Sequence, residues 1–256
     1  MGNDIHYNLA LQKKRWVSYF DLLGVKSLFD PENQFSLITT LAESPAFKNK
    51  ENYLSVFLSL STAIEKLKKR VKSYKNIGYV PFSDTLIVYT DDDSGSFCDI
   101  DRISRWFVYD LINSGDGIPI RGAMSCAEFY VDRENDLFFG EALTEAYKYG
   151  EAQDWIGFLL CPSVEEQLKS LGISDGKTSN YACTYIPFKK GQCTLNKKLP
   201  AFVIGKCEAN DNSKSIIEKL SQMKNRIADE SIQSKYDRTI EFILKNERVL
   251  SSEINR

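Results

Sequence analysis

The chain has 256 residues, of which 43% are hydrophobic and 27% charged, and its formal net charge is -2. This is the composition of an ordinary globular protein, and the near-neutral charge argues against a general nucleic-acid binder, which usually carries a basic surplus. No run approaches the roughly 18 apolar residues of a membrane span, and the N-terminus lacks the apolar core of a secretion signal. We therefore expect a cytoplasmic protein without a membrane span.

The cysteine and histidine residues do not form the patterns of a metal site, a disulfide framework or a catalytic pair. The six cysteines form no CxxC pair, and His6 is the single histidine. Zinc sites, disulfide frameworks and Ser-His or Cys-His catalysis are all poorly supported by this pattern. Carboxylates, hydroxyls, lysines and bound metal ions remain as the chemical groups of a site.

The first half of the chain predicts a strand, a helical region, a hairpin and a second helix. Residues 15–20 are rich in aromatic and β-branched side chains, which is typical of a buried strand. Apolar residues between 54 and 71 keep helical spacing, with lysines on the opposite face. Residues 76–80 and 85–90 are β-rich runs joined by a short link, and an apolar helical stripe over 100–112 follows.

The second half alternates in the same way. Further strands and helices are predicted at residues 118–131, 137–139, 140–153, 155–160, 181–187, 201–204 and 216–249, of which 140–153 and 216–249 are helical. The order strand, helix, hairpin, helix, strand is that of a ferredoxin-like (βαββαβ) α+β sheet with helices on one face. We expect a catalytic domain over residues 1–205 and an appended helical segment over 206–256.

Asp21 and Asp84 are the candidate metal ligands. Asp21 ends the first strand, and Asp84 lies at the tip of the predicted hairpin. Neighbouring elements of a sheet would bring the two carboxylates together. Hard ions such as Mg²⁺ on a nucleotide usually take one or two carboxylates and complete their shell with phosphate and water, although Asp is also a common turn residue.

Over roughly residues 15–165 the chain resembles the class III nucleotidyl cyclase family. The FxDxxG motif of its first strand resembles Phe20-Asp21-Leu22-Leu23-Gly24, and its hairpin tip resembles Ser83-Asp84. Its RxGxxxG strand and following GxxVNxAxR helix resemble the segments that begin at Arg121 and Gly140.

This resemblance implies a site that holds a nucleoside triphosphate with two Mg²⁺ or Mn²⁺ ions. It assigns the metal ions to Asp21, Leu22 and Asp84. It assigns the nucleotide to Phe20, Leu23, Gly24, Val25, Lys26, Phe82 and Arg121. The turn from Leu22 to Lys26 would offer backbone N–H groups to the phosphates. Arg121 has a second interpretation, as a buried ion-pair partner of Glu128 or Glu141.

Two catalytic positions depart from the family pattern. Thr144 and Lys148 stand where the family has an Asn that orients the ribose and an Arg that stabilises phosphate charge. Four residues make about one helical turn, so both side chains face the same way. A threonine can still bond a sugar oxygen, and a lysine can act as a point cation.

The base-recognition positions depart further. Val80 and Leu137 stand where the ATP-using members carry a Lys and an Asp, so ATP is disfavoured. Nearby aromatic residues could hold a smaller base, namely Tyr79, Phe82, Phe138 and Phe139. The pattern is similar to bacterial pyrimidine cyclases of anti-phage defence, which implies cyclic CMP or cyclic UMP as product, a homodimer with shared sites, and a separate effector that the product activates.

Three other functions remain open. The replaced Asn and Arg suit a degenerate cyclase fold that senses a nucleotide without turnover. A purine nucleotide cyclase is a further alternative, and a polymerase-like palm enzyme also pairs two metal aspartates. A basic run at 66–75 is interpreted as the solvated face of a helix.

Overall fold

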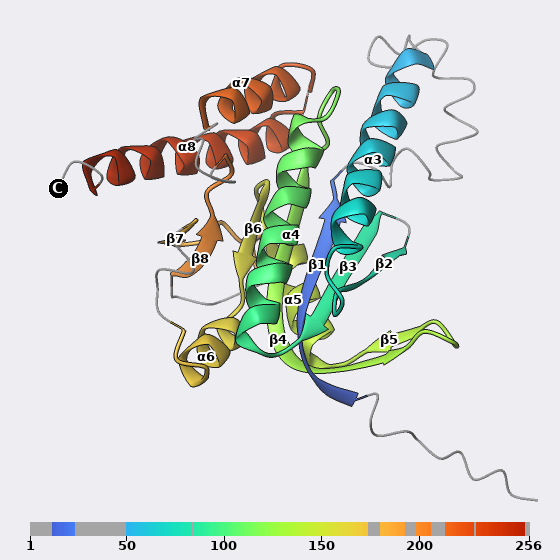
Figure 1. The fold of residues 1–256 in the computed structure, drawn as a ribbon. Helices are drawn as coiled ribbons and strands as arrows, with labels where there is room; N and C mark the ends of the chain where they lie inside the picture. The colour runs from blue at the N-terminus through green and yellow to red at the C-terminus, as the bar shows by residue number, and fades with distance from the viewer. Residues whose placement is uncertain are drawn as a thin grey trace, which may run out of the picture.

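The structure, a computed structural model, describes residues 12–23, 50–82, 84–173, 180–192, 198–205, 213–227 and 229–253. In chain order its elements are β1 (Gln12–Leu22), α3 (Lys50–Val71), β2 (Gly78–Phe82), β3 (Thr85–Asp91), α4 (Ser94–Asn113), β4 (Ile120–Asp132), β5 (Leu137–Phe139), α5 (Glu141–Ala152), β6 (Gly157–Leu160), α6 (Pro162–Ser170), β7 (Tyr181–Thr184), β8 (Leu199–Phe202), α7 (Ser213–Lys224) and α8 (Glu230–Glu253). They form a mixed α+β fold built on one multi-stranded sheet (Figure 1).

The first six elements form the predicted ferredoxin-like core. The strands run in the order β2-β3-β1-β4, and each neighbouring pair is antiparallel. Alternate residues of β1, including Trp16 and Phe20, point to the face that α3 and α4 cover. This confirms the predicted order of elements and the placement of both crossover helices on one face.

A further helix, α5, covers the other face of the sheet. Val17 and Tyr19 of β1 point to this side, where they share a cluster with Ala142 and Ala146 of α5. The small alanines and Gly150 let the helix lie close to the sheet. A Cβ placed on Gly150 would lie 2.8 Å from the Tyr19 ring. The core is thus a three-layer arrangement with β1 at its centre.

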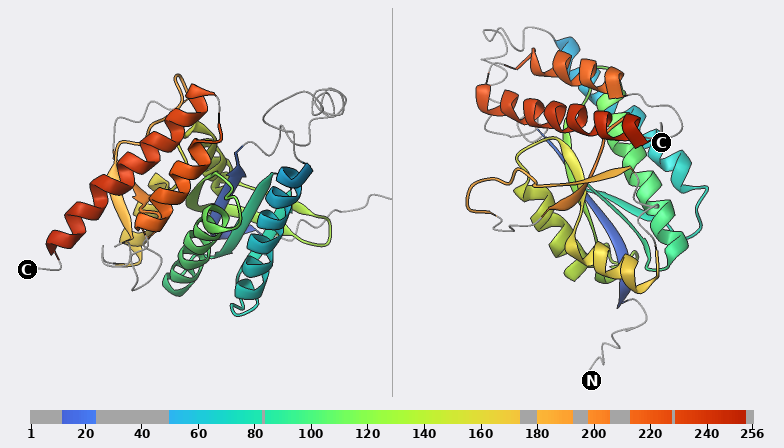
Figure 2. Two further views of the ribbon diagram at one scale, coloured as in Figure 1. Left: turned by 90° about the horizontal axis from the view of Figure 1, so that it is seen from above. Right: turned by 90° about the vertical axis from the view of Figure 1, so that its left-hand side faces the viewer.

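The sheet continues beyond β4 through β6, β8 and β7, and β6 runs parallel to β4. Helices α7 and α8 pack across this end of the molecule (Figure 2). Ile216, Leu220 and Ile243 of these helices are buried in the same core as α4. The Thr239 hydroxyl also accepts a hydrogen bond from the Ile156 N–H at 3.0 Å, which ties α8 to the start of β6.

Sequence reasoning missed α6 and overestimated several strands. Helix α6 has only nine residues, so its apolar pattern is too short to stand out, although Pro162 occupies a favoured position in its first turn. The strand expected over residues 155–160 begins at 157, and that expected over 181–187 ends at 184. Beyond these ends Trp155, Ile156 and Ile186 are buried in irregular backbone, whereas Tyr185 is 61% exposed.

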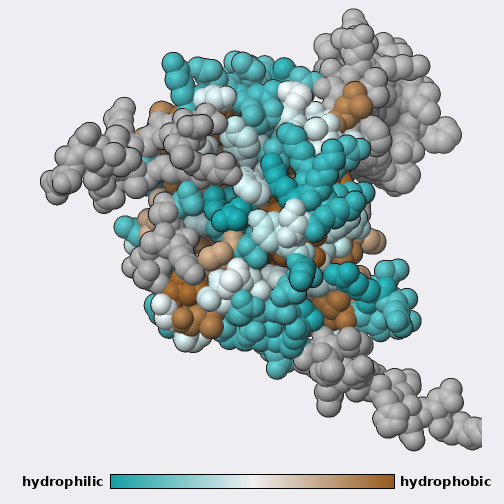
Figure 3. All heavy atoms as spheres, viewed as in Figure 1, coloured by the Kyte–Doolittle hydropathy of each residue, from teal (hydrophilic) through white to brown (hydrophobic). Residues whose placement is uncertain are grey.

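The outer surface over α3 and α4 is largely hydrophilic (Figure 3). Lys66, Lys68, Lys69 and Lys72 of the basic run are exposed there, as expected for a solvated helix face. Among the helices of the described ranges, none combines the length and apolar character needed to cross a bilayer.

We predict that Gly150→Ala destabilises the protein by about 1 to 2 kcal/mol, because crowding against Tyr19 outweighs the gain in helix propensity. Urea unfolding measures the change. The control is Gly95→Ala in α4, where the new Cβ meets Asp93 Oδ1 at 3.1 Å. We expect the control to change stability by less than about 0.5 kcal/mol. Equal losses in both variants would contradict close packing at Gly150.

Candidate functional site

A row of side chains crosses the sheet at the end of β1. Asp21 pairs in register with Thr85 on one side and with Arg121 on the other, and Thr85 pairs in turn with Phe82. Directly paired residues of a sheet project to the same face. The register therefore aligns an aromatic ring, a hydroxyl, a carboxylate and a guanidinium on the face that α5 covers.

Asp84 is placed beside this row by the hairpin between β2 and β3. The Leu22 N–H donates to the Asp84 carbonyl oxygen at 2.9 Å, so the end of β1 is fastened to the hairpin tip. Both aspartates are buried, with 4% of each residue exposed. The two predicted metal ligands, which are 63 positions apart in sequence, thus lie at neighbouring positions in the fold.

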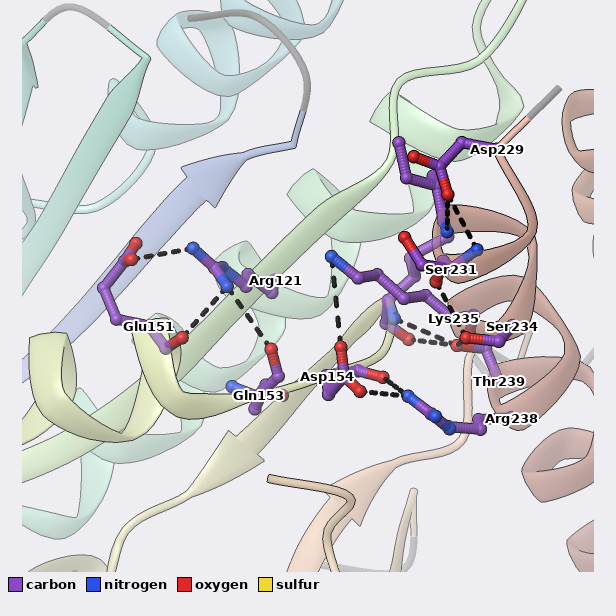
Figure 4. A network of polar contacts seen from close by, with 12 residues as sticks. Arg121, Glu151, Gln153, Asp154, Asp229, Ser231, Ser234, Lys235, Arg238 and Thr239 are labelled. Atoms are coloured by element: carbon purple, nitrogen blue, oxygen red, sulfur yellow. Dashed lines mark hydrogen bonds and ion pairs between the residues drawn. The ribbon is translucent and has the colours of Figure 1, made fainter. Parts of the chain in front are cut away.

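Arg121 binds Asp21 directly. Its Nε and Nη2 atoms lie 2.8 and 2.7 Å from Asp21 Oδ2, and Nη2 also lies 2.7 Å from Glu151 Oε2. Its Nη1 donates to the carbonyl oxygens of Glu151 and Gln153 at 2.9 and 3.3 Å (Figure 4). These carbonyls lie at the C-terminal end of α5, where a cation is favoured by the helix dipole.

The two carboxyl groups of this cluster differ in their affinity for a proton. Burial raises the pKa of Asp21, although Arg121 opposes the shift. Burial also acts to raise the pKa of Glu151, but Arg121 and a hydrogen bond with Asp21 outweigh it, so that this pKa is lowered. Burial raises the pKa of the Tyr19 hydroxyl, which donates to Glu151 Oε1 at 3.3 Å. The more buried Asp21 carboxyl is therefore harder to ionise than the Glu151 carboxyl.

The predicted alternative partners of Arg121 were wrong. Neither Glu128 nor Glu141 forms its ion pair; Asp21 and Glu151 do. The register explains the difference, because Arg121 is paired with Asp21 while Glu128 is paired with Lys14 at the far end of β1. Glu141 begins α5, and it is the opposite end of that helix that reaches Arg121.

A cavity of about 780 Å³ begins beside the aspartates. Thr85, which follows Asp84 and pairs with Asp21, is part of its lining. Its other lining residues are Tyr79, Val80, Pro81, Phe82, Ile87, Tyr89, Arg133, Asp136 and Phe138. Three of the four aromatic residues predicted to hold a base line this cavity, whereas Phe139 stacks on Tyr130 with ring centroids 4.7 Å apart. Leu137, the other substituted base position, is 49% exposed on β5.

Thr144 and Lys148 lie on the exposed side of α5. The Thr144 hydroxyl donates to the Gly140 carbonyl oxygen at 3.0 Å, one turn earlier in the chain. The opposite side of the helix carries Ala142 and Ala146, which are fully buried against the sheet. Both predicted catalytic side chains are thus presented outward.

The remaining predicted site residues differ in how far their side chains are exposed. The Phe20 side chain is fully buried between Phe107 and Phe158, so its main chain alone is left to meet a ligand. The Leu22 side chain is likewise buried in the core, whereas Leu23 is half-buried and its N–H donates to the Pro119 carbonyl oxygen. Phe82 is 75% exposed at the cavity edge. Gly24, Val25 and Lys26 lie outside the described residues.

Sequence reasoning missed Glu151 and Lys189. Glu151 lies seven positions after Thr144 and three after Lys148, and this spacing places all three on one helix face, a signal that could have found it. Lys189 follows a segment whose backbone pairs with the end of α5 through the bond from Lys189 N–H to the Ala152 carbonyl oxygen. This bond brings Lys189 to the end of α5 that carries Glu151, and burial and then the charge of Arg121 lower the pKa of Lys189. No spacing in the sequence indicates that contact.

The donor set fits a divalent ion bound together with a nucleotide. Asp21 and Asp84 carry hard oxygen donors next to Thr85, which lines the cavity, and phosphate and water usually complete such a shell. The described residues contain no group of three or more His, Cys, Asp or Glu side chains that could hold a metal ion. The fit therefore rests on the two aspartates.

Comparisons with known proteins find similarity in structure alone. No protein-family model matches the sequence, and a search of curated proteins returns no match either. Adenylate cyclases from Trypanosoma brucei are similar over 78% of this chain and 92% of theirs, with 6% identity and a TM-score of 0.47. The guanylate cyclase domain of RhGC from Catenaria anguillulae, in complex with GTP, is similar over 75% of this chain and 96% of its own, with 10% identity and a TM-score of 0.45. The adenylyl cyclase CyaB from P. aeruginosa is similar over 75% of this chain and 93% of its own, with 12% identity and a TM-score of 0.40.

We predict that Arg121→Ala destabilises the protein by about 3 to 5 kcal/mol, because it leaves two neighbouring carboxylates without their buried cation. The control is Arg238→Ala, since Arg238 pairs with Asp154 nearby but its side chain is 40% exposed. We expect the control to lose less than about 1 kcal/mol. Urea unfolding measures the free energy of unfolding of both variants. If Arg121→Ala loses as little stability as the control, the charge cluster contributes little to the stability of the fold.

Proposed function

We propose that this chain is a metal-dependent pyrimidine nucleotide cyclase, which converts CTP or UTP into the 3′,5′-cyclic monophosphate and pyrophosphate. The observation that carries the proposal is the row that places Asp21 between Thr85 and Arg121, with Asp84 fastened beside it. This arrangement offers two buried carboxylates next to a cavity large enough for a nucleotide.

In the reaction the ribose 3′-oxygen attacks the α-phosphorus, loses its proton, and displaces pyrophosphate from the same phosphorus. Asp21 and Asp84 would hold Mg²⁺ or Mn²⁺. Such ions neutralise triphosphate charge and make the 3′-hydroxyl easier to deprotonate. Arg121 fixes the Asp21 carboxylate through its Nε and Nη2 contacts. Lys148 would stabilise charge on the phosphates, and Thr144 would bond the ribose.

The lining of the cavity supports a pyrimidine base. Tyr79, Phe82 and Phe138 supply aromatic surface, and Val80 supplies an apolar wall where a purine-reading lysine would stand. The polar groups lie elsewhere, at Arg133 and Asp136. The Arg133 Nε donates to the Tyr89 hydroxyl at 2.8 Å, which leaves its terminal nitrogens for a base edge.

The exposed positions of Thr144 and Lys148 support a homodimer in which each active site is shared. One protomer would supply Asp21 and Asp84, and its partner would supply Thr144 and Lys148. On the sequence resemblance alone, we further propose that the cyclic nucleotide is a messenger in anti-phage defence and activates a separate effector protein.

We predict that Asp21→Asn and Asp84→Asn each abolish turnover while the protein stays folded, because each removes one of two charged metal ligands. Purified protein is incubated with Mn²⁺ and each of the four triphosphates, and mass spectrometry identifies the product. Cyclic CMP or cyclic UMP is the expected result. Cyclic AMP or cyclic GMP would support a purine cyclase instead, linear or dinucleotide products a palm enzyme, and full activity in both variants would refute the metal assignment.

A second prediction tests the shared site. Asp21→Asn and Lys148→Ala are each expected to be inactive, but mixed dimers contain one intact site. An equimolar mixture that has exchanged subunits should therefore regain about a quarter of wild-type activity. The control is a mixture of Asp21→Asn protein with Asp84→Asn protein. Both aspartates belong to the same half of each proposed site, so no mixed dimer contains an intact site and no activity should return. No recovery in the first mixture would place Thr144 and Lys148 with the aspartates of their own chain.

The ion pair at Asp21 favours a second candidate, a cyclase fold that binds a nucleotide without turnover. Arg121 already satisfies Asp21 Oδ2, and Thr144 and Lys148 replace the residue types expected for catalysis. Tight binding of one triphosphate without any pyrophosphate release, in the same four-nucleotide experiment, would support this sensor.

A further inference from the structure

Glu151 is a carboxylate beside the candidate metal ligand to which neither motif nor pattern assigns a role. Its Oε2 lies 2.7 Å from Arg121 Nη2, and its Oε1 accepts a hydrogen bond from the Tyr19 hydroxyl at 3.3 Å. The side chain is 26% exposed, whereas that of Asp21 is 5% exposed. Glu151 therefore stands between the buried ion pair and the open side of the site.

Arg121 creates a difficulty for a metal at Asp21. A guanidinium keeps its positive charge in proteins, and two of its N–H groups are directed at one oxygen of Asp21. Since Arg121 is also bound to the carbonyl oxygens of Glu151 and Gln153, it is held in place independently of Asp21. A divalent cation approaching Asp21 thus meets a fixed positive charge in a buried setting, where charges interact strongly.

We propose that Glu151 is a positioning residue that offsets the charge of Arg121 and so keeps Asp21 able to attract a divalent cation. Among the three ion-paired groups Asp21, Arg121 and Glu151, one net negative charge remains for the metal. Without Glu151, the charge of Arg121 would cancel that of Asp21. This inference rests on the proposed metal site and adds a residue to it.

The charge of Glu151 acts on more than one cation. Lys189 lies within electrostatic range of Glu151, Arg121 and Asp21. The Tyr19 hydroxyl orients one oxygen of Glu151, and Arg121 binds the other, so the carboxylate has a defined position. A hydrogen-bonded second layer of this kind commonly tunes the affinity of a metal ligand.

The test is Mn²⁺ affinity without nucleotide, measured from the electron paramagnetic resonance signal of free Mn²⁺. Glu151→Gln keeps the shape and loses the charge, and we expect it to weaken Mn²⁺ binding at least about tenfold. Glu151→Asp keeps the charge and should stay within about threefold of wild type. The double variant Arg121→Gln with Glu151→Gln removes both charges and should also return to within about threefold. The double variant still leaves Asp21 without the guanidinium of Arg121, but the glutamine amide introduced there can donate to Asp21 Oδ2, and circular dichroism checks that the variant is folded.

The matched control is Asp154→Asn, because Asp154 is a nearby carboxylate paired with Arg238 rather than with Arg121. Its Mn²⁺ affinity should equal that of wild type. Unchanged affinity in Glu151→Gln would overturn the inference. So would a double variant as weak as Glu151→Gln, since Glu151 would then bind the metal itself. The variant Asp21→Asn distinguishes failure of the proposed metal site from failure of this inference. If Asp21→Asn binds Mn²⁺ as tightly as wild type, the proposed metal site is refuted. If Asp21→Asn loses Mn²⁺ affinity but Glu151→Gln does not, only the role of Glu151 is refuted.

Discussion

The site depends on the pairing register of β1 with β3 and β4. A shift of one residue would turn every side chain of β1 to the opposite face, so that Asp21 would enter the apolar core and Phe20 would face α5. The core prevents that shift, because Trp16 and Phe20 pack under α4 while Val17 and Tyr19 pack under α5. Hydrophobic packing on both faces thus fixes where Asp21 meets Thr85 and Arg121.

The same packing supplies the charges around Asp21. Gly150 allows the last turn of α5 to approach the sheet. A Cβ atom placed on Gly150 would lie 3.7 Å from the Gly122 Cα atom. This close approach brings the helix C-terminus to Arg121, where carbonyl oxygens and the Glu151 carboxylate receive the guanidinium. Two small residues, each on a different element, therefore determine which groups surround the candidate metal ligand.

The sequence was most informative for features that depend on one residue or one local pattern and not on which distant residues come into contact. The aromatic and β-branched run of β1 and the helical stripe of α4 predicted the ferredoxin-like core, and the positions of Asp21 and Asp84 at element ends made them the candidate metal ligands. The partner of Arg121 could not be predicted, because it depends on which residue of β1 lies opposite. Lys189 could not be selected either, since its approach to the cluster follows from how the backbone at residues 187–189 pairs with the end of α5.

Helix α5 also constrains how Thr144 and Lys148 can take part. The three residues Thr144, Lys148 and Glu151 share one helix face, but a helix rises 1.5 Å per residue, so Thr144 lies about 10 Å along the axis from Glu151. Glu151 is the residue at the level of Asp21, as its hydrogen bonding with Asp21 and its ion pair with Arg121 require. In the proposed reaction the ribose 3′-oxygen would react beside Asp21, and a threonine about 10 Å along the helix axis lies beyond hydrogen-bonding reach of that position. The proposed role of Thr144 therefore calls for a second protomer, whereas the proposed binding of a nucleotide at the aspartates and the cavity does not.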